Sequence, residues 1–168
     1  MWFKWVSAHF LFIQGGKMAS NNEILKEAVL NLIESPLQTE GCEIAELVVS
    51  QYKKGATVRV FVYSEGGVNL ERCRSLSNTV GDILDGTDLF ESGYTLEVSS
   101  PGLERPLQRA IDFKYRIGEM VSIQFAEARK ASVKARIVAV NDGEVFFENE
   151  SGPFTESLAN IERAKIVY

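Results

Sequence analysis

Two adjacent serines, Ser99 and Ser100, stand where a hydrolase could carry its nucleophile, within the stretch "YTLEVSSPGLERPL". A serine nucleophile needs a neighbouring base to take its proton. The stretch contains neither histidine nor lysine. The ionisable partners nearby are Glu97, Glu104 and Arg105. We therefore predict that the protein is not an enzyme and that the two hydroxyls bond locally to the backbone and shape a turn.

Metal and cofactor chemistry also lacks its usual residues. The chain has one histidine, and none follows Met18, which excludes a His-dependent triad or a His-containing zinc site in residues 18–168. Cys42 and Cys73 stand far apart, with no other soft ligand. No two glycines have the GxxG spacing, and the Gly81–Gly86 pair is not followed by Lys-Ser/Thr. We predict no metal and no cofactor.

The first 17 residues differ from the rest of the chain. They contain both tryptophans and the only histidine. We interpret residues 1–17 as a non-native or misassigned leader with Met18 as the functional start; an aromatic membrane-surface anchor is the alternative. Two cysteines form no disulfide framework, and there is no run of 18 apolar residues. These features predict a cytoplasmic protein that does not enter a membrane.

The order of periodic segments predicts an α/β unit over residues 18–100. Ser20 and Glu23 form a capping-box pattern, and apolar residues at helical spacing predict a helix ending between Pro36 and Gly41. Strands follow at 43–52 and 56–64, the latter with Val58, Val60 and Val62 on a buried face and Arg59, Phe61 and Tyr63 on the opposite face. Asn69 opens a second helix with Cys73 on its apolar stripe, and a third strand ends at the bend.

After residue 101 the pattern changes to a short helix and five short strands, which predicts a small β-barrel over 101–168. Asn141-Asp142-Gly143 predicts a hairpin turn, and the last strand is expected at 164–168. The fold class is therefore α+β with two domains. Proline fixes φ and glycine permits unusual φ, so the bend predicts a stiff interdomain joint. Its residues are Ser99, Ser100, Pro101, Gly102 and Pro106.

Charge differs between the two predicted domains. Residues 18–100 carry 13 acidic and 6 basic side chains, whereas residues 101–136 carry 8 basic and 4 acidic ones. An acidic domain attracts a cationic protein, and a basic segment can contact phosphate. We predict an RNA or ribosome contact at Arg105, Arg109, Arg129, Lys130 and Lys134. A salt bridge to Glu104 or another neighbouring acid is an equal alternative for Arg105.

The bend segment closely resembles the signature of the bacterial ribosome maturation factor RimP family. "VFVYSEGGVNLERCRSLSNTVGDILD", "DFKYRIGEMV" and "LANIERAKIV" also resemble segments of that family. The resemblance implies a KH-related αββαβ first domain without the GxxG loop and an Sm/SH3-like barrel. Two positions depart from the family: it usually has aspartate at the position of Tyr63, and often arginine before an aromatic residue where this chain has Tyr115-Arg116.

The resemblance also implies a function, namely non-catalytic help in ribosome biogenesis. Such a factor binds the immature small ribosomal subunit, with small-subunit rRNA and a basic ribosomal protein as partners. We expect it to act as a monomer whose bend holds both domains for simultaneous binding. The alternative is a stand-alone RNA-binding regulator that uses its Sm-like barrel and binds free RNA without ribosomal particles.

Overall fold

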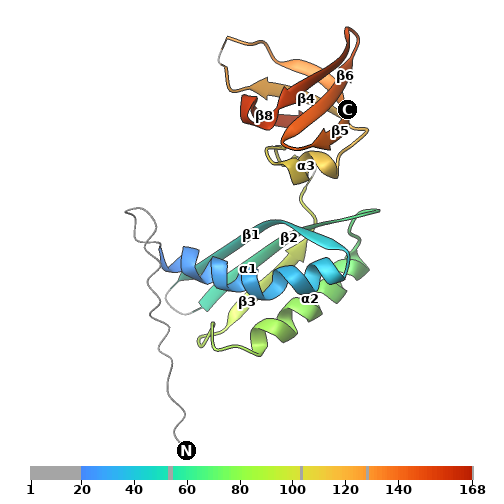
Figure 1. Cartoon of the computed structure of the whole chain (residues 1–168). Helices are drawn as coiled ribbons and strands as arrows, with labels where there is room; N and C mark the ends of the chain where they lie inside the picture. The colour runs from blue at the N-terminus through green and yellow to red at the C-terminus, as the bar shows by residue number, and fades with distance from the viewer. Residues whose placement is uncertain (1–19, 53–54, 103, 128, 168) are drawn as a thin grey trace, which may run out of the picture.

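The structure is a computed structural model that describes residues 20–52, 55–102, 104–127 and 129–167. The leader predicted at 1–17 lies outside the described residues. The fold is α+β, with two units joined by a narrow connection (Figure 1). The N-terminal unit runs from α1 to β3, and the C-terminal unit from α3 to β8. The N-terminal elements are α1 (Asn21–Thr39), β1 (Cys42–Tyr52), β2 (Gly55–Ser64), α2 (Leu70–Asp85) and β3 (Tyr94–Ser99).

Helix α1 begins at the predicted capping box. The Ser20 Oγ accepts a hydrogen bond from the Glu23 amide at 3.3 Å, and the Ser20 amide donates to the Glu23 carboxylate at 2.7 Å. The helix continues through Pro36 and ends at Thr39, within the predicted interval. Gly41 follows with φ +72°, a value that favours glycine, and its amide donates to the Gln38 carbonyl at 2.9 Å.

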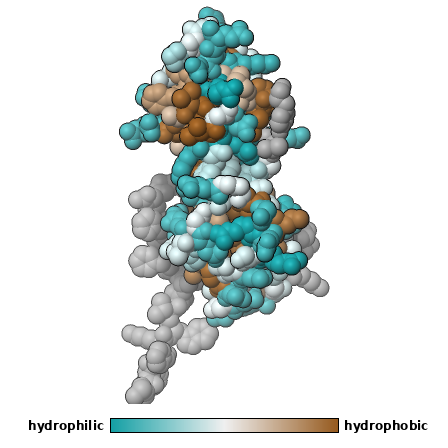
Figure 2. Space-filling model, turned by 90° about the vertical axis from the view of Figure 1, so that its right-hand side faces the viewer, coloured by the Kyte–Doolittle hydropathy of each residue, from teal (hydrophilic) through white to brown (hydrophobic). Residues whose placement is uncertain are grey.

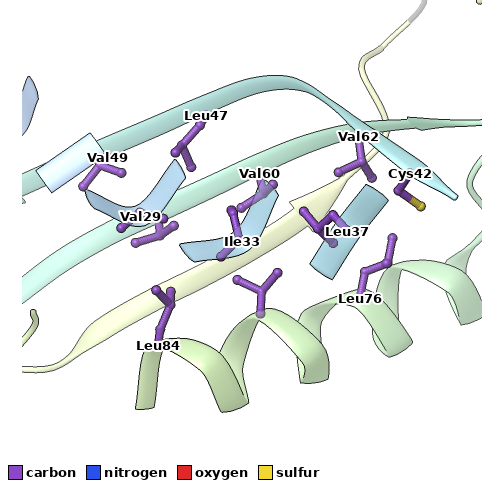
Figure 3. Close-up of a cluster of buried hydrophobic side chains, with 12 residues drawn as sticks. Val29, Ile33, Leu37, Cys42, Leu47, Val49, Val60, Val62, Leu76 and Leu84 are labelled. Atoms are coloured by element: carbon purple, nitrogen blue, oxygen red, sulfur yellow. The ribbon is translucent and has the colours of Figure 1, made fainter. Parts of the chain in front are cut away.

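The N-terminal sheet has the order β1-β2-β3, with β1 antiparallel and β3 parallel to β2. The parallel β2–β3 pair requires a crossover, which α2 supplies. Asn69 caps α2 by accepting from the Arg72 amide at 2.8 Å. Both helices cover one face of the sheet (Figure 1). The apolar core lies between these helices and the sheet, as Figure 3 shows. Fully buried members include Val29, Ile33, Leu37, Val58, Val60, Val62, Leu76 and Val80.

Two side chains of the N-terminal unit differ from expectation. Cys73, predicted to be buried, is only half-buried, whereas Cys42 is buried. Tyr63, predicted on the solvent face of β2 with Arg59, is 6% exposed. The alternation of β2 is correct as far as Val62; Tyr63 is buried because the C-terminal unit covers the end of the strand, which a local pattern does not encode.

The C-terminal unit is a five-stranded antiparallel sheet of order β7-β6-β5-β4-β8, preceded by a short helix. The predicted hairpin turn is confirmed: Asp142 and Gly143 have φ of 47° and 82° between β5 and β6. The last strand begins earlier than predicted, at Ile161, and pairs with β4 across a register shift. The elements are α3 (Ala110–Lys114), β4 (Met120–Phe125), β5 (Val133–Asn141), β6 (Glu144–Asn149), β7 (Gly152–Ser157), the 3₁₀ turn η1 (Leu158–Asn160) and β8 (Ile161–Ile166).

A second, separate apolar core fills the C-terminal unit. Phe147 stacks on Phe154 with 5.3 Å between ring centroids, and meets Phe113 edge-on at 6.1 Å. Both geometries suit the aromatic quadrupole. Phe113 belongs to α3, so this helix is anchored inside the C-terminal core, while its Asp112 and Lys114 side chains bond to the N-terminal unit.

Candidate functional site

The bend connects two fixed points of the backbone. Ser99 ends β3, opposite Phe61 in β2. Leu107 exchanges backbone hydrogen bonds of 2.8 and 2.9 Å with Ala164 of β8. Between these points, the Arg105 amide donates to the Gly102 carbonyl at 3.2 Å. The connection is therefore held by sheet pairing at one end and by a strand bridge at the other.

Individual bend residues refine the predicted joint. Pro101 is buried, Pro106 is half-buried, and Ser100 and Gly102 are exposed. Gly102 is absent from the positive-φ residues, and a Cβ at this position would meet no atom within 4 Å. The bend therefore uses the fixed φ of Pro101 but not the conformational freedom of Gly102. Neither serine hydroxyl of the bend finds a hydrogen-bond partner among the described residues, so the expected local bonds are not seen there.

Asp112 lies at the centre of the junction and is only 1% exposed. Its carboxylate accepts from the Gln108 and Arg109 amides at 3.2 and 3.0 Å, which caps α3. It also accepts a 3.3 Å bond from the Tyr63 hydroxyl of the N-terminal unit. The guanidiniums of Arg109 and Arg105 approach to 3.6 and 4.0 Å. A buried charge needs such partners, and here one of them comes from the other unit.

Two tyrosine rings also join the units. Tyr63 and Tyr115 stack at 4.9 Å between centroids, with 9° between ring planes. The Tyr115 hydroxyl donates to Glu43 Oε1 at 3.0 Å. Burial and the bond to Glu43 raise the pKa of Tyr115 to about 12, and burial together with the Asp112 charge raises the pKa of Tyr63. Both hydroxyls therefore remain protonated donors at neutral pH.

Two ion pairs complete the contact. Arg105 bonds to Glu46, and Lys114 bonds to Glu43. The hydrogen bond from Lys114 lowers the pKa of Glu43, since it favours the charged carboxylate. We call these side chains the interunit cluster. Its members are Glu43, Glu46 and Tyr63 of the N-terminal unit and Arg105, Asp112, Lys114 and Tyr115 of the C-terminal side.

The structure divides the predicted contact cations into two groups. Arg105 and Arg109 lie at the junction between the units, each with an acidic partner. For Arg105, the structure shows the alternative of a salt bridge to an acid, and that acid is Glu46. Arg129 and Lys134 are exposed, whereas Lys130 bonds to Glu156 and lies 3.8 Å over the Phe125 ring. The segment with Arg129 and Lys130 connects β4 to β5, away from the N-terminal unit (Figure 1).

The interunit cluster can hold two units together, but it does not resemble a reaction centre. Its acids and bases are bonded to each other. Figure 2 shows mostly hydrophilic surface at the narrow part between the units. In the described part of the chain, no three His, Cys, Asp or Glu side chains gather as metal ligands. No helix of that part is long and apolar enough to cross a membrane.

Sequence reasoning missed most of the interunit cluster. Tyr115, Glu43 and Glu46 carried no local signal, because each looks like an ordinary surface residue in its own segment. One weak signal existed at α3: Asp112 stands three positions after Arg109, where a carboxylate can cap a helix. Pairing across more than 40 positions cannot be seen from local periodicity.

The fold and the junction define a protein of two sheet-forming units held together by a polar contact. Residues 32–104 match the family model described as the RimP N-terminal domain. The matched range extends from within α1 to residue 104, inside the bend. Over these residues the chain is thus similar to the RimP family, a family of non-catalytic ribosome maturation factors. This confirms the resemblance inferred from the bend segment.

The positions that depart from the family pattern contact each other. Tyr63 stacks on Tyr115, and both are positions at which the sequence is expected to depart from the family pattern. The two departures thus belong to a single interunit contact.

Proposed function

We propose that this chain is a non-catalytic factor that assists assembly of the small ribosomal subunit by binding the immature particle. The family match supports this proposal, since RimP proteins are ribosome maturation factors. The partners would be small-subunit rRNA and a basic ribosomal protein, and the factor would act as a cytoplasmic monomer. The single observation that carries the proposed mode of binding is the interunit cluster, which joins the two units by directed bonds.

The proposal divides the chain into domains at 18–100 and 101–168, with 1–17 as a leader. The αββαβ order with parallel β2 and β3 is consistent with a KH-related domain. The five short antiparallel strands are consistent with an Sm/SH3-like barrel. Each unit has its own apolar core, which supports the division.

The charges of the two units support assigning a different partner to each. Residues 18–100 carry a net charge of −7, which suits a basic ribosomal protein. On the C-terminal unit, Arg129 and Lys134 are exposed and available to rRNA phosphate. Arg105 and Arg109 have acidic partners, so we assign them mainly to the junction. Lys130 is intermediate, because Glu156 already binds it.

The mechanism requires no bond to be made or broken. A factor that binds the native arrangement of rRNA and protein more tightly than other arrangements shifts the population toward it. When two units bind at once, the second contact forms at a high effective concentration. A fixed angle between the units makes this gain specific for one geometry of the particle.

Sedimentation of purified components tests the proposal. The protein should travel with immature small subunits and not with translating ribosomes. If its C-terminal unit contacts RNA mainly through Arg129 and Lys134, affinity should fall with salt at a shallow log–log slope of ~−1.4 to −1.8. Binding to free RNA with no preference for the particle would instead indicate the stand-alone RNA regulator.

A variant pair at the bend sharpens the test. Pro101→Ala removes a buried ring that fixes φ and should weaken binding to the particle while both units stay folded. Gly102→Ala is the matched control: its φ is ordinary and its Cβ meets no atom, so binding should not change. Equal binding by both variants would remove the bend from the mechanism.

A further inference from the structure

A cleft of about 570 Å³ lies beside the interunit cluster. It is lined by residues 62–68 at the end of β2, by the bend at 100–102, and by residues 114–117 after α3. A ligand in this cleft would touch both units and the bend together. Its binding would therefore depend on the angle between the units.

Arg116 is the unusual side chain of this cleft. Its Nε is shielded from solvent and has no hydrogen-bond partner within the described residues. The described ion pairs do not include it. Lys114, the other cation of the lining, already binds Glu43. An ionised donor without an acceptor is costly, and an acceptor brought by a ligand would remove that cost.

The backbone around Arg116 is well placed for such a ligand. The Arg116 amide donates to Phe113, and its carbonyl accepts from Glu119, both at 3.0 Å, so the main chain at this position is fixed. The side chain is only half-buried, so a rotamer change can bring Nε to the opening. Across the cleft, a Cβ at Gly66 or Gly67 would meet no atom within 4 Å, so a ligand can approach this turn closely.

We propose that Arg116 binds a backbone phosphate of single-stranded RNA in this cleft. This inference rests on the proposed function, which supplies RNA as a partner. A guanidinium pairs with phosphate through two parallel hydrogen bonds. Among the described residues, the lining has one cation with no bonded acid, Arg116, and one acid, Glu65, so it suits the single charge of a phosphodiester better than a run of acidic side chains. The basic excess of residues 101–136 attracts the rest of the RNA strand.

Fluorescence anisotropy of the full chain tests the proposal with a labelled ten-nucleotide single-stranded RNA. Arg116→Gln should weaken binding about tenfold, the size of one charge-assisted contact. Arg116→Lys should fall between, because lysine keeps the charge but not the fork. Arg74→Gln is the matched control, since Arg74 is an exposed cation of α2 outside the cleft lining, and binding should stay within about twofold.

A stability measurement separates ligand binding from a structural role. Because Nε has no hydrogen-bond partner among the described residues, Arg116→Gln should unfold at the same temperature as the unchanged chain or higher. A lower melting temperature would make Arg116 a structural residue and overturn the proposal. So would equal RNA binding by Arg116→Gln and Arg74→Gln.

Two further outcomes decide the ligand class and its context. A peptide of ten glutamates that binds more tightly than the RNA, and loses this binding in Arg116→Gln, would replace RNA with an acidic protein and overturn the proposal. Particle sedimentation by the unchanged chain keeps the proposed function separate: if the chain sediments with small subunits while Arg116→Gln binds RNA normally, only the cleft proposal fails. If the chain never sediments with them but Arg116 still governs RNA binding, only the proposed function fails.

Discussion

Phe147 and Asp112 are equally hidden from solvent, each 1% exposed, yet their surroundings are opposite. Phe147 lies among aromatic and aliphatic side chains, whereas Asp112 is surrounded by amide, hydroxyl and guanidinium donors. Apolar burial is strong but non-directional, whereas hydrogen bonds depend on angle and distance. The apolar core of each unit therefore stabilises that unit. The polar interunit cluster determines how one unit is oriented on the other.

The largest expected effect on stability comes from a substitution in an apolar core. Phe147→Ala should lower the free energy of unfolding of the C-terminal unit by about 3–5 kcal/mol through a lost ring and a cavity. Urea unfolding followed by amide signals of each unit measures this effect. Val138→Ala, at an exposed position of β5, should cost little. If Phe147→Ala destabilised both units equally, the two cores would not be independent and the comparison would be wrong.

Placing opposite charges at the stacked tyrosines, Tyr63 and Tyr115, should have the next largest effect on stability. Tyr63→Asp places a second carboxylate beside Asp112 and should cost up to about 3 kcal/mol. Adding Tyr115→Arg should restore much of the loss, since arginine supplies the opposite charge at the stacking position. Thermal unfolding of the two single variants and the double variant gives the coupling energy. Strictly additive losses would show that the two positions do not interact.

Removing the buried carboxylate should have a moderate effect. Asp112→Ala leaves the Gln108 and Arg109 amides and the Tyr63 hydroxyl without their acceptor, at a cost of about 1–3 kcal/mol. Because α3 is also anchored by Phe113, the unit should still fold but sit loosely on its neighbour. Small-angle X-ray scattering should show a broader range of shapes; an unchanged profile would place the control of orientation elsewhere.

The smallest effect is expected at the exposed ion pair between Lys114 and Glu43. The folded pKa of Glu43 is lowered, so its stabilising contribution is present above the unfolded pKa and is lost as pH falls through the folded value. The contact should therefore loosen as the pH falls below the ordinary pKa of a glutamate. Glu43→Gln should flatten this acid response and cost about 0–1 kcal/mol at neutral pH. An acid response that survives in Glu43→Gln would belong to another carboxylate.

Local patterns predicted the elements but not the contact between the units. Capping at Ser20 and Asn69, the alternation of Val58, Val60 and Val62, and the hairpin at Asn141 were all readable, because each depends on neighbours within a few positions. The burial of Tyr63 and Asp112 was not readable, because each is buried by the other unit.

The same contrast between local and long-range features holds for the predicted site residues. Pro101 lies between β3 and α3, at the point where the two sequence patterns meet. The role of Gly102 was overestimated, since glycine permits unusual φ without requiring it. Arg105 was chosen for its charge, and its charge is indeed used in the described contacts, by Glu46. Composition identifies a cation but not its partner.

Residual dipolar couplings of backbone amides in the N-terminal and C-terminal units test the fixed angle most directly. The account predicts that a single alignment tensor fits both units of the unchanged chain. It also predicts that the tensors separate in Asp112→Ala, whose orienting bonds are gone. Two unrelated tensors in the unchanged chain would mean that the units reorient freely, and would contradict binding through a fixed pair of domains.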